Sequence, residues 1–453
     1  MWARWVRRRQ RIQVIVIVLS FATSTDGWAA EPTIPLEIAA MSSVAPLPLS
    51  LRGALDAALG NNPNVRLYKE RIAGARGHVM TQFGAMLPQI SGTTRQSQQT
   101  SFLGTLGLAP VRTDVFSIFD ARASYTQNVF SLSLIQRWRA SREALKVAEL
   151  ESEGAKADAM AAVGLLYMEA LKAHASVQMH ETNQQLLSDL LAFSRRRQAG
   201  GMATGLDTAR LESQLENEKQ RVSIARYDFE RAKLSLTNAM GLPIDTPLQL
   251  TDEFHTITDI LPSVDEATEP AISQRPEVQA QYQRIKATDL GLSAALGERI
   301  PSIVTQGDYG LIGNRVQNTL ATYNVAVLLQ IPIFDGFQRE GRISEARSQV
   351  HQESLRMEGV TLQVKMEVRE ALFTFTGAKE QLTIASSGLK ASLTELQLAR
   401  ERFAVLTAGN NLEVTNAIHS VARARENTVD ALFRLNAARV HLARATGELD
   451  KLR

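Results

Sequence analysis

The sequence contains no cysteine in 453 residues, and this absence excludes several kinds of site at once. A chain without thiols forms no disulfides and no Cys-ligated zinc or iron–sulfur centres, and it has neither a thiolate nucleophile nor a lipidated N-terminal cysteine. Histidine is also sparse, and its seven residues never recur at the i, i+4 spacing of a helical metal site. No Ser/His/Asp arrangement is evident. We therefore expect no catalytic activity, no metal and no cofactor.

Basic charge is concentrated at the N-terminus. The whole chain has a formal net charge of +3, and five arginines lie within the first eleven residues, directly before an apolar run at 12–22. A charged segment, a short apolar core and small residues at Gly27, Ala29 and Ala30 are typical of a secretory signal peptide. The apolar run is shorter than the ~20 residues that a membrane-spanning helix needs. We expect cleavage after Ala29, and Ala22 after Ser20 is the alternative.

Removing residues 1–29 removes the excess of basic residues from the chain. The cleaved segment carries five basic residues and one acidic residue, so 45 basic residues remain against 46 acidic ones. The mature chain is then nearly neutral, and no basic patch interleaved with aromatic residues occurs elsewhere in it. Nucleic acid is therefore not an expected partner.

The chain contains an internal duplication. Pro63 and Pro88 in the first half match Pro276 and Pro301 in the second, at a constant offset of 213 residues. An Ala-x-x-x-Leu-x-x-Ala-x-Gly pattern occurs twice, ending at Gly241 and Gly447. Matching positions at constant spacing indicate two copies of one structural unit.

The distribution of proline predicts where the long helices lie. All 14 prolines fall within 32–110 or 243–301 or at Pro332, so that 131–242 and 333–453 have none. Because proline interrupts helices, these two stretches are expected to be helical. Each stretch is interrupted once, by a Gly-rich cluster near 200 and by a Gly/Asn cluster near 408. Each is therefore predicted to form a helical hairpin with its tip at the cluster.

The apolar positions of the predicted hairpins form narrow, alanine-rich seams. Leu211, Leu215, Val222 and Ala225 follow coiled-coil spacing, and a similar series begins at Ala417 in the second repeat. A narrow seam buries little area per residue and needs neighbouring helices. The pattern therefore predicts an oligomer.

Two segments alternate with a period of two and predict strands. Residues 119–129 and 320–331 place apolar and polar side chains on opposite faces over at least ten residues, which is long enough for a bilayer-spanning strand. Ordinary surface hairpins of a water-soluble protein give the same alternation. Four strands cannot close a barrel with a lumen, so a membrane role requires several copies of the chain.

The boundaries expected from these patterns divide the chain into five parts. They are a signal peptide at 1–29, an extended segment at 30–50, a first repeat at 51–245, a linker at 246–264 and a second repeat at 265–453. Strands are expected at about 90–102 and 115–130 in the first repeat and at about 302–312 and 319–334 in the second.

In these features the chain resembles the TolC-like outer-membrane efflux proteins. The resemblance rests on the duplicated proline-flanked helices and on two strand-to-helix junctions, Asn128-Val-Phe-Ser131 and Ile331-Pro-Ile-Phe-Asp335-Gly336. It also rests on the first hairpin tip, Arg197-x-x-x-Gly201-x-Ala-Thr204-x-Leu206-Asp207. No single motif is specific, but their order and double occurrence are.

The resemblance implies a mainly α-helical fold with a membrane β-barrel contribution. Family members are homotrimers in which four strands per protomer form a 12-stranded barrel above a long helical tunnel. They reside in the outer membrane of Gram-negative bacteria, contact its lipid and extend into the periplasm. A periplasmic adaptor protein docks at the hairpin tips and connects the channel to an inner-membrane transporter of the RND or ABC type.

The resemblance also assigns candidate residues at the tips. Acidic gate positions fall on Asp207 and Glu413, the second ring position falls on Asn416, and a basic linking position falls on Gly409, which weakens the match to the family gate. Asp207 and Glu413 are equally expected as helix N-terminal acids. The candidates for adaptor docking are Arg195, Arg196, Arg197, Gly201, Thr204, Leu206, Arg402, Thr407, Gly409 and Leu412.

A second hypothesis is a secreted or periplasmic coiled-coil protein with a structural or adhesive role. It accounts for the signal peptide and the helices. It does not account for the duplicated amphipathic strands. The exported substrate cannot be read from either pattern.

Overall fold

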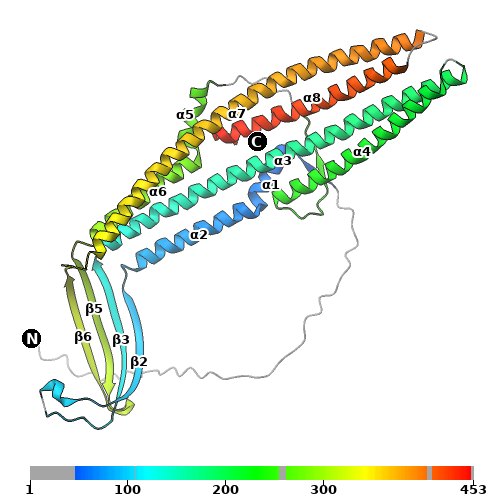
Figure 1. Ribbon diagram of the computed structural model, residues 1–453. Coiled ribbons are helices and arrows are strands. Elements are labelled where there is room, and N and C mark those ends of the chain that lie inside the picture. Colours follow the sequence, from blue (N-terminus) through cyan, green and yellow to red (C-terminus); the bar gives the residue numbers. More distant parts are fainter. Residues whose placement is uncertain (1–45, 108, 202, 255–261, 406–410, 450–453) are drawn as a thin grey trace, which may run out of the picture. The chain divides into compact units, whose positions relative to one another are not determined.

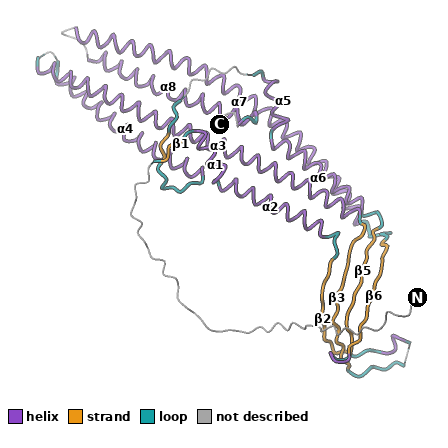
Figure 2. Tube along the Cα trace, turned by 180° about the vertical axis from the view of Figure 1, so that it is seen from behind, coloured by secondary structure: helices purple, strands orange, loops and turns teal. Residues whose placement is uncertain are grey.

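A computed structural model describes residues 46–107, 109–201, 203–254, 262–405 and 411–449 (Figure 1). The expected signal peptide, most of the expected N-terminal segment and two tip candidates, Thr407 and Gly409, lie outside these residues. The described part is mainly helical and has one four-stranded sheet (Figure 2). None of its helices combines the length and the apolarity needed to cross a membrane.

The helices occur in two sets of four with the same lengths in the same order. In the first repeat, α1 (Leu51–Asn61), α2 (Pro63–Gly84), α3 (Leu132–Ala199) and α4 (Gly205–Met240) have 11, 22, 68 and 36 residues. In the second repeat, α5 (Val264–Gln274), α6 (Pro276–Gly297), α7 (Gln338–Val405) and α8 (Asn411–Thr446) have the same four lengths. Sequence patterns predicted the long hairpins, but α1 and α5 were not expected as helices.

The short helices complete the length of the long ones. In Figure 1, α4 and α2 follow one another along α3, and Asn62 at the start of α2 donates from Nδ2 to the carbonyl of Ala239 near the end of α4, at 2.7 Å. Proline occupies the first position of α2 and of α6. A backbone N–H at this position makes no hydrogen bond within the helix, so proline, which lacks this group, is well suited to it.

The four strands form a single antiparallel sheet in the order β2-β3-β5-β6. Strands β2 (Gln89–Gln99) and β3 (Phe116–Phe130) come from the first repeat, and β5 (Ser302–Gly313) and β6 (Thr319–Gln330) come from the second. Two short 3-10 helices, Leu103–Leu106 and Val316–Asn318, lie in the two hairpin connections. Pairing of β3 with β5 joins the repeats and leaves β2 and β6 as the edges.

The last strand is shorter than the alternation suggested. Strand β6 ends at Gln330, whereas the sequence pattern extended it to 334. Pro332 has no N–H to donate to a strand ladder. The chain then turns at Gly336 and Phe337, both of which have positive φ. Phe337 is the one non-glycine residue with positive φ among those described. The turn starts α7 in a new direction.

The expected N-terminal segment and linker also meet in the structure. Strand β1 (Leu47–Leu49) pairs in parallel with β4 (Leu248–Leu250). Next to them the Tyr167 hydroxyl, which is fully buried in α3, lies 2.9 Å from the Leu49 carbonyl and 3.0 Å from Oδ2 of Asp252. This contact holds both connecting segments against the first long helix.

The apolar core consists of separate clusters along the helices. One cluster surrounds Tyr167 and includes α1 residues, and a second lies near the hairpin tips and combines residues from α3, α4, α7 and α8. Leu211, Val222 and Val421 are buried there or nearby, in agreement with the predicted seams. The core near the tips therefore holds the two hairpins against each other.

Candidate functional site

The first hairpin tip is a glycine turn followed by a capped helix. Gly201 has a φ of 70°, and Thr204 then caps α4 by accepting from the backbone N–H of Asp207. The Asp207 carboxylate in turn accepts hydrogen bonds from the backbone N–H of Thr204 at 3.2 Å and from the Thr204 hydroxyl at 2.7 Å. Such a capping box satisfies amide groups that the first turn of a helix leaves without partners. The candidate gate residue Asp207 thus has a structural role as well.

The second tip places its acidic candidate in an ion pair. Glu413 lies in the first turn of α8, and its carboxylate is 3.3 Å from the guanidinium of Arg402 near the end of α7. Both side chains are about half exposed or more, so water screens the pair. Asn416 lies one turn further along α8 and is also exposed.

The three consecutive arginines of the first tip have different environments. Arg195 and Arg196 are exposed, and Arg195 is 3.1 Å from Glu212 of α4. Arg197 is only 8% exposed, and its guanidinium lies 4.5 Å from the ring centroid of Phe403 and donates to the Phe403 carbonyl. The sequence suggested that Arg197 presents its charge to solvent. In the structure Arg197 is buried instead and connects α3 to α7.

Neighbouring contacts reinforce this connection between the hairpins. The Phe403 ring packs edge-on against Phe193 of α3 at 5.8 Å and so joins the hairpins. Within the first hairpin, Thr208 of α4 donates to the side-chain oxygen of Gln198 of α3 at 2.7 Å. Leu206 at the tip is 60% exposed, which leaves an apolar side chain available to a partner. The tip thus combines a packed interior with an exposed rim.

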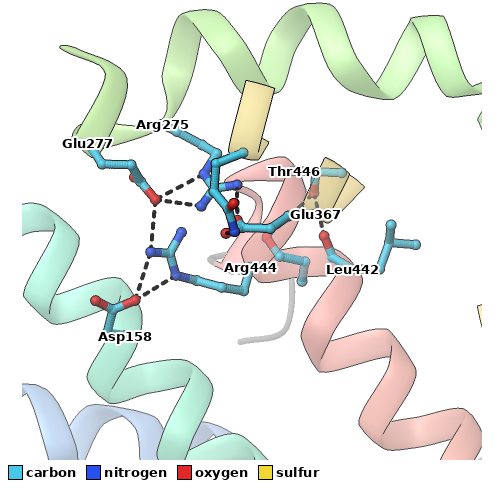
Figure 3. A network of polar contacts seen from close by, with 9 residues as sticks. Asp158, Arg275, Glu277, Glu367, Leu442, Arg444 and Thr446 are labelled. Carbon is cyan, nitrogen blue, oxygen red and sulfur yellow. Dashed lines mark hydrogen bonds and ion pairs between the residues drawn. The ribbon is translucent and has the colours of Figure 1, made fainter. Parts of the chain in front are cut away.

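A network of ion pairs lies away from the tips, where α8 ends and α6 begins (Figure 3). Arg275, which is 4% exposed, forms ion pairs with Glu277 at 2.5 Å and with Glu367 of α7 at 2.6 Å. Arg444 of α8 lies 3.0 Å from the same Glu277 and 2.7 Å from Asp158 of α3. Five charged side chains from four helices therefore converge.

The electrostatics of the network favour the ionised form of Glu277. Burial by itself raises the pKa of the Glu277 carboxyl, but hydrogen bonds from Arg275 and the nearby charge of Arg444 outweigh burial and lower that pKa below its ordinary value. The charges of Glu277 and Asp158 in turn raise the pKa of Arg444, against the effect of its burial. Sequence reasoning missed this network because three of its four ion pairs join residues that are at least 92 positions apart.

Another buried pair also went unpredicted. His180 of α3 lies 2.7 Å from Glu218 of α4, whose side chain is 6% exposed. The separation of 38 residues gives no local signal. Within the described ranges, no group of three His, Asp or Glu side chains is arranged so that it could hold a metal ion.

The sheet carries large apolar side chains that no other described part of the chain covers. Tyr323, Val325 and Val327 of β6 are each more than 70% exposed, and they share one face of the strand. An exposed apolar face of this kind marks contact with lipid or with another protein.

Comparison with known proteins gives consistent results along most of the chain. A family model described as "Outer membrane efflux protein" matches twice, at residues 54–242 and 268–448. The chain is 25% identical to protein CyaE of Bordetella pertussis over 83% of its own length and 82% of that protein. It is 24% identical to outer membrane protein OprJ of Pseudomonas aeruginosa, over 88% and 84%.

Solved structures share the fold at lower identity. The outer membrane channel CmeC of Campylobacter jejuni superposes with a TM-score of 0.77 at 15% identity, over 88% of this chain and 85% of that one. The outer membrane protein VceC of Vibrio cholerae gives a TM-score of 0.76 at 16% identity, over 88% and 96%.

Proposed function

The chain belongs to the outer membrane efflux protein family, and we propose that it forms the outer-membrane exit duct of a tripartite efflux or type I secretion system. The observation that carries the proposal is the sheet. In the described residues it has four strands, two edges without a partner strand and an exposed apolar face, and strands β3 and β6 lead into the helices of 68 residues. A membrane sheet must close on itself, because lipid cannot satisfy the edge N–H and C=O groups.

Closure requires further copies of the same chain. Three copies supply twelve strands, and edge β6 of one copy then pairs with edge β2 of the next. The helical hairpins of the three copies form the tunnel that continues from the barrel through the periplasm. Each helix of 68 residues is about 100 Å long, at ~1.5 Å per residue.

The channel itself supplies no energy. An inner-membrane transporter of the RND or ABC type delivers the substrate, and a periplasmic adaptor protein connects the two. The adaptor contacts the exposed rim of the tips, to which Arg195, Arg196 and Leu206 contribute in the first hairpin and Arg402 in the second. The proposed docking surface also includes Gly201, Thr204, Leu412, Thr407 and Gly409.

The gate lies at the same tips. Three copies of Asp207, Glu413 and Asn416 surround the threefold axis in the closed state, and separation of the hairpins widens the opening. The Arg197 contact with Phe403 keeps the two hairpins of one chain together during this movement. The Arg402 ion pair partly offsets the charge of Glu413.

Replacing Glu413 with alanine should weaken the block of the channel by polyvalent cations. Like charges gathered around a narrow pore bind cations, and this variant removes three of them. Single-channel conductance in planar bilayers, with the cation added on the tip side, measures the effect. Arg402→Ala is the matched control and should strengthen the block. An unchanged block in Glu413→Ala channels contradicts the gate role and leaves the channel itself intact.

Cell fractionation separates the proposed channel from a secreted coiled-coil protein. A channel is recovered from outer-membrane fractions as trimers that need detergent and change mobility on heating. Recovery as a soluble periplasmic protein contradicts the proposed function.

A further inference from the structure

All charged residues of the four sheet strands lie on one face. They are Arg95, Asp120, Arg122 and Asp308. Register places Arg95 opposite Asp120, and it places Ser124, two residues from Arg122, opposite Asp308. Residues that are opposite one another, or two apart on one strand, share a face. The four charges therefore form a compact group near the middle of the strands.

Three of the four form a joined set of ion pairs. Arg122 Nε lies 2.7 Å from Asp120 Oδ1, and Nη1 lies 2.7 Å from Asp308 Oδ1. The pairs connect β3 to β5 and thus connect the two repeats. Each side chain is only about a quarter exposed even in the single chain, because the three cover one another.

Gly310 makes room for this arrangement. It is the register partner of Arg122, and a Cβ atom at position 310 would lie 2.3 Å from the Arg122 Cβ. Contacts below 3.0 Å do not occur, so only glycine leaves the strands this close. The close approach brings the guanidinium of Arg122 across to Asp308.

The charged face must be the inner one if the sheet closes in a membrane. The opposite face carries Tyr309, Tyr323 and Val325, which are 63–80% exposed. A basic side chain facing lipid near the midplane destabilises a barrel, whereas one facing the lumen remains in contact with water. The inner face of the barrel thus carries one belt of charge. The other residues of this face are uncharged, and they include both polar side chains such as Asn324 and apolar ones such as Ile118 and Leu320.

Resting on the proposed channel function, we infer that Asp120, Arg122, Asp308 and Arg95 set the charge preference of the barrel lumen. Each chain contributes two arginines and two aspartates, so three copies form a belt without net charge. Such a belt leaves the lumen open to solutes of either sign. Loss of one member from each chain gives the belt a net charge of three.

Two substitutions test the inference because they charge the belt oppositely. Arg122→Gln should raise the K⁺/Cl⁻ permeability ratio about twofold, and Asp308→Asn should lower it by a similar factor, since a ring of three charges acts over about 10 Å at 0.1 M salt. Reversal potentials across planar bilayers under a KCl gradient give the ratio. Asn324→Ser, on the same face next to Asp308 in register, is the uncharged control and should leave it unchanged.

A second measurement covers variants that fail to assemble. Ser124 lies opposite Asp308, and the native chain has no cysteine, so Ser124→Cys can be modified after assembly with cationic or anionic thiosulfonate reagents. The two reagents should shift the permeability ratio in opposite directions. Channels of normal conductance whose ratio does not respond to any of these changes overturn the inference while the channel stands. Absence of channels from the unmodified protein overturns the proposed function instead.

Discussion

Replacing Arg275 with methionine should destabilise the helical part of the protein by about 3–5 kcal/mol, the typical cost of removing one partner from a buried ion pair. Arg275 is 4% exposed and faces two carboxylates, those of Glu277 and Glu367. Methionine fills a similar volume, so the loss comes chiefly from the two acids. Both would remain partly buried, Glu277 with its ion pair to Arg444 and Glu367 without its ion pair to Arg275 (Figure 3).

Thermal unfolding of the detergent-solubilised protein, followed by circular dichroism, measures this effect. Lys219→Met is the matched control, because it removes a cation from an exposed pair with Glu216 that contributes less than about 1 kcal/mol. A second variant, Arg275→Met combined with Glu277→Gln and Glu367→Gln, should recover much of the loss by removing the unpaired charges. A shift for Arg275→Met no larger than that for Lys219→Met contradicts the role of the network.

Replacing Gly241 with alanine should cost about 3–5 kcal/mol, from a strained backbone and a steric clash together. Gly241 ends α4 with a φ of 71°, a conformation that favours glycine. A Cβ atom there would lie 2.5 Å from the Asn61 carbonyl oxygen and 2.8 Å from its carbon, both of which belong to the backbone. The end of α1 and the start of α2 would have to move away from α4.

The second repeat provides the matched control for this change. Gly447 ends α8 with a φ of 78° and the same pattern of C-terminal hydrogen bonds. The nearest atom to an added Cβ there is Cγ of Arg275, at 3.7 Å, which is an ordinary contact. Gly447→Ala should therefore cost only the backbone strain, about 1–2 kcal/mol. Equal losses of thermal stability in the two variants would show that close packing of α1 against Gly241 is unimportant.

Local patterns in the sequence were sufficient to predict the long elements. The absence of proline marked α3, α4, α7 and α8, the glycine cluster marked the first tip, and alternation marked β3 and β6. These signals repeat every few residues over long stretches, so errors at single positions matter little. At the ends of elements the signal is weaker, and β6 stops four residues before the predicted boundary because of Pro332.

Contacts between distant segments could not be predicted in the same way. The ion pairs of Arg275 and Arg444, the contact of His180 with Glu218, and the pairing of β1 with β4 each join residues that no local pattern relates. Helices α1 and α5 are only 11 residues long, and their amphipathic pattern is too brief to distinguish them from loops. Tertiary packing determines all of these features.

The hairpin tips contain one residue whose role could be predicted from the sequence and one whose role could not. Asp207 was expected as a helix N-terminal acid, and it forms the capping box with Thr204. The burial of Arg197 could not be inferred from three consecutive arginines, since it depends on the position of Phe403 in the other hairpin, 206 residues away. The gate role of the tips is a proposal that the conductance of Glu413→Ala channels tests.

The orientation of the sheet is the point on which the proposed channel depends most directly. Asn324 and Val325 are adjacent in β6, are both exposed in the single chain, and lie on opposite faces. Because the chain has no cysteine of its own, Asn324→Cys and Val325→Cys can each be treated in intact outer membranes with a charged, water-soluble maleimide. In a closed barrel with the charged face inward, the cysteine at 324 reacts rapidly from the lumen, and the cysteine at 325 reacts only after detergent denaturation. Equal reactivity at both positions in the membrane would contradict the barrel.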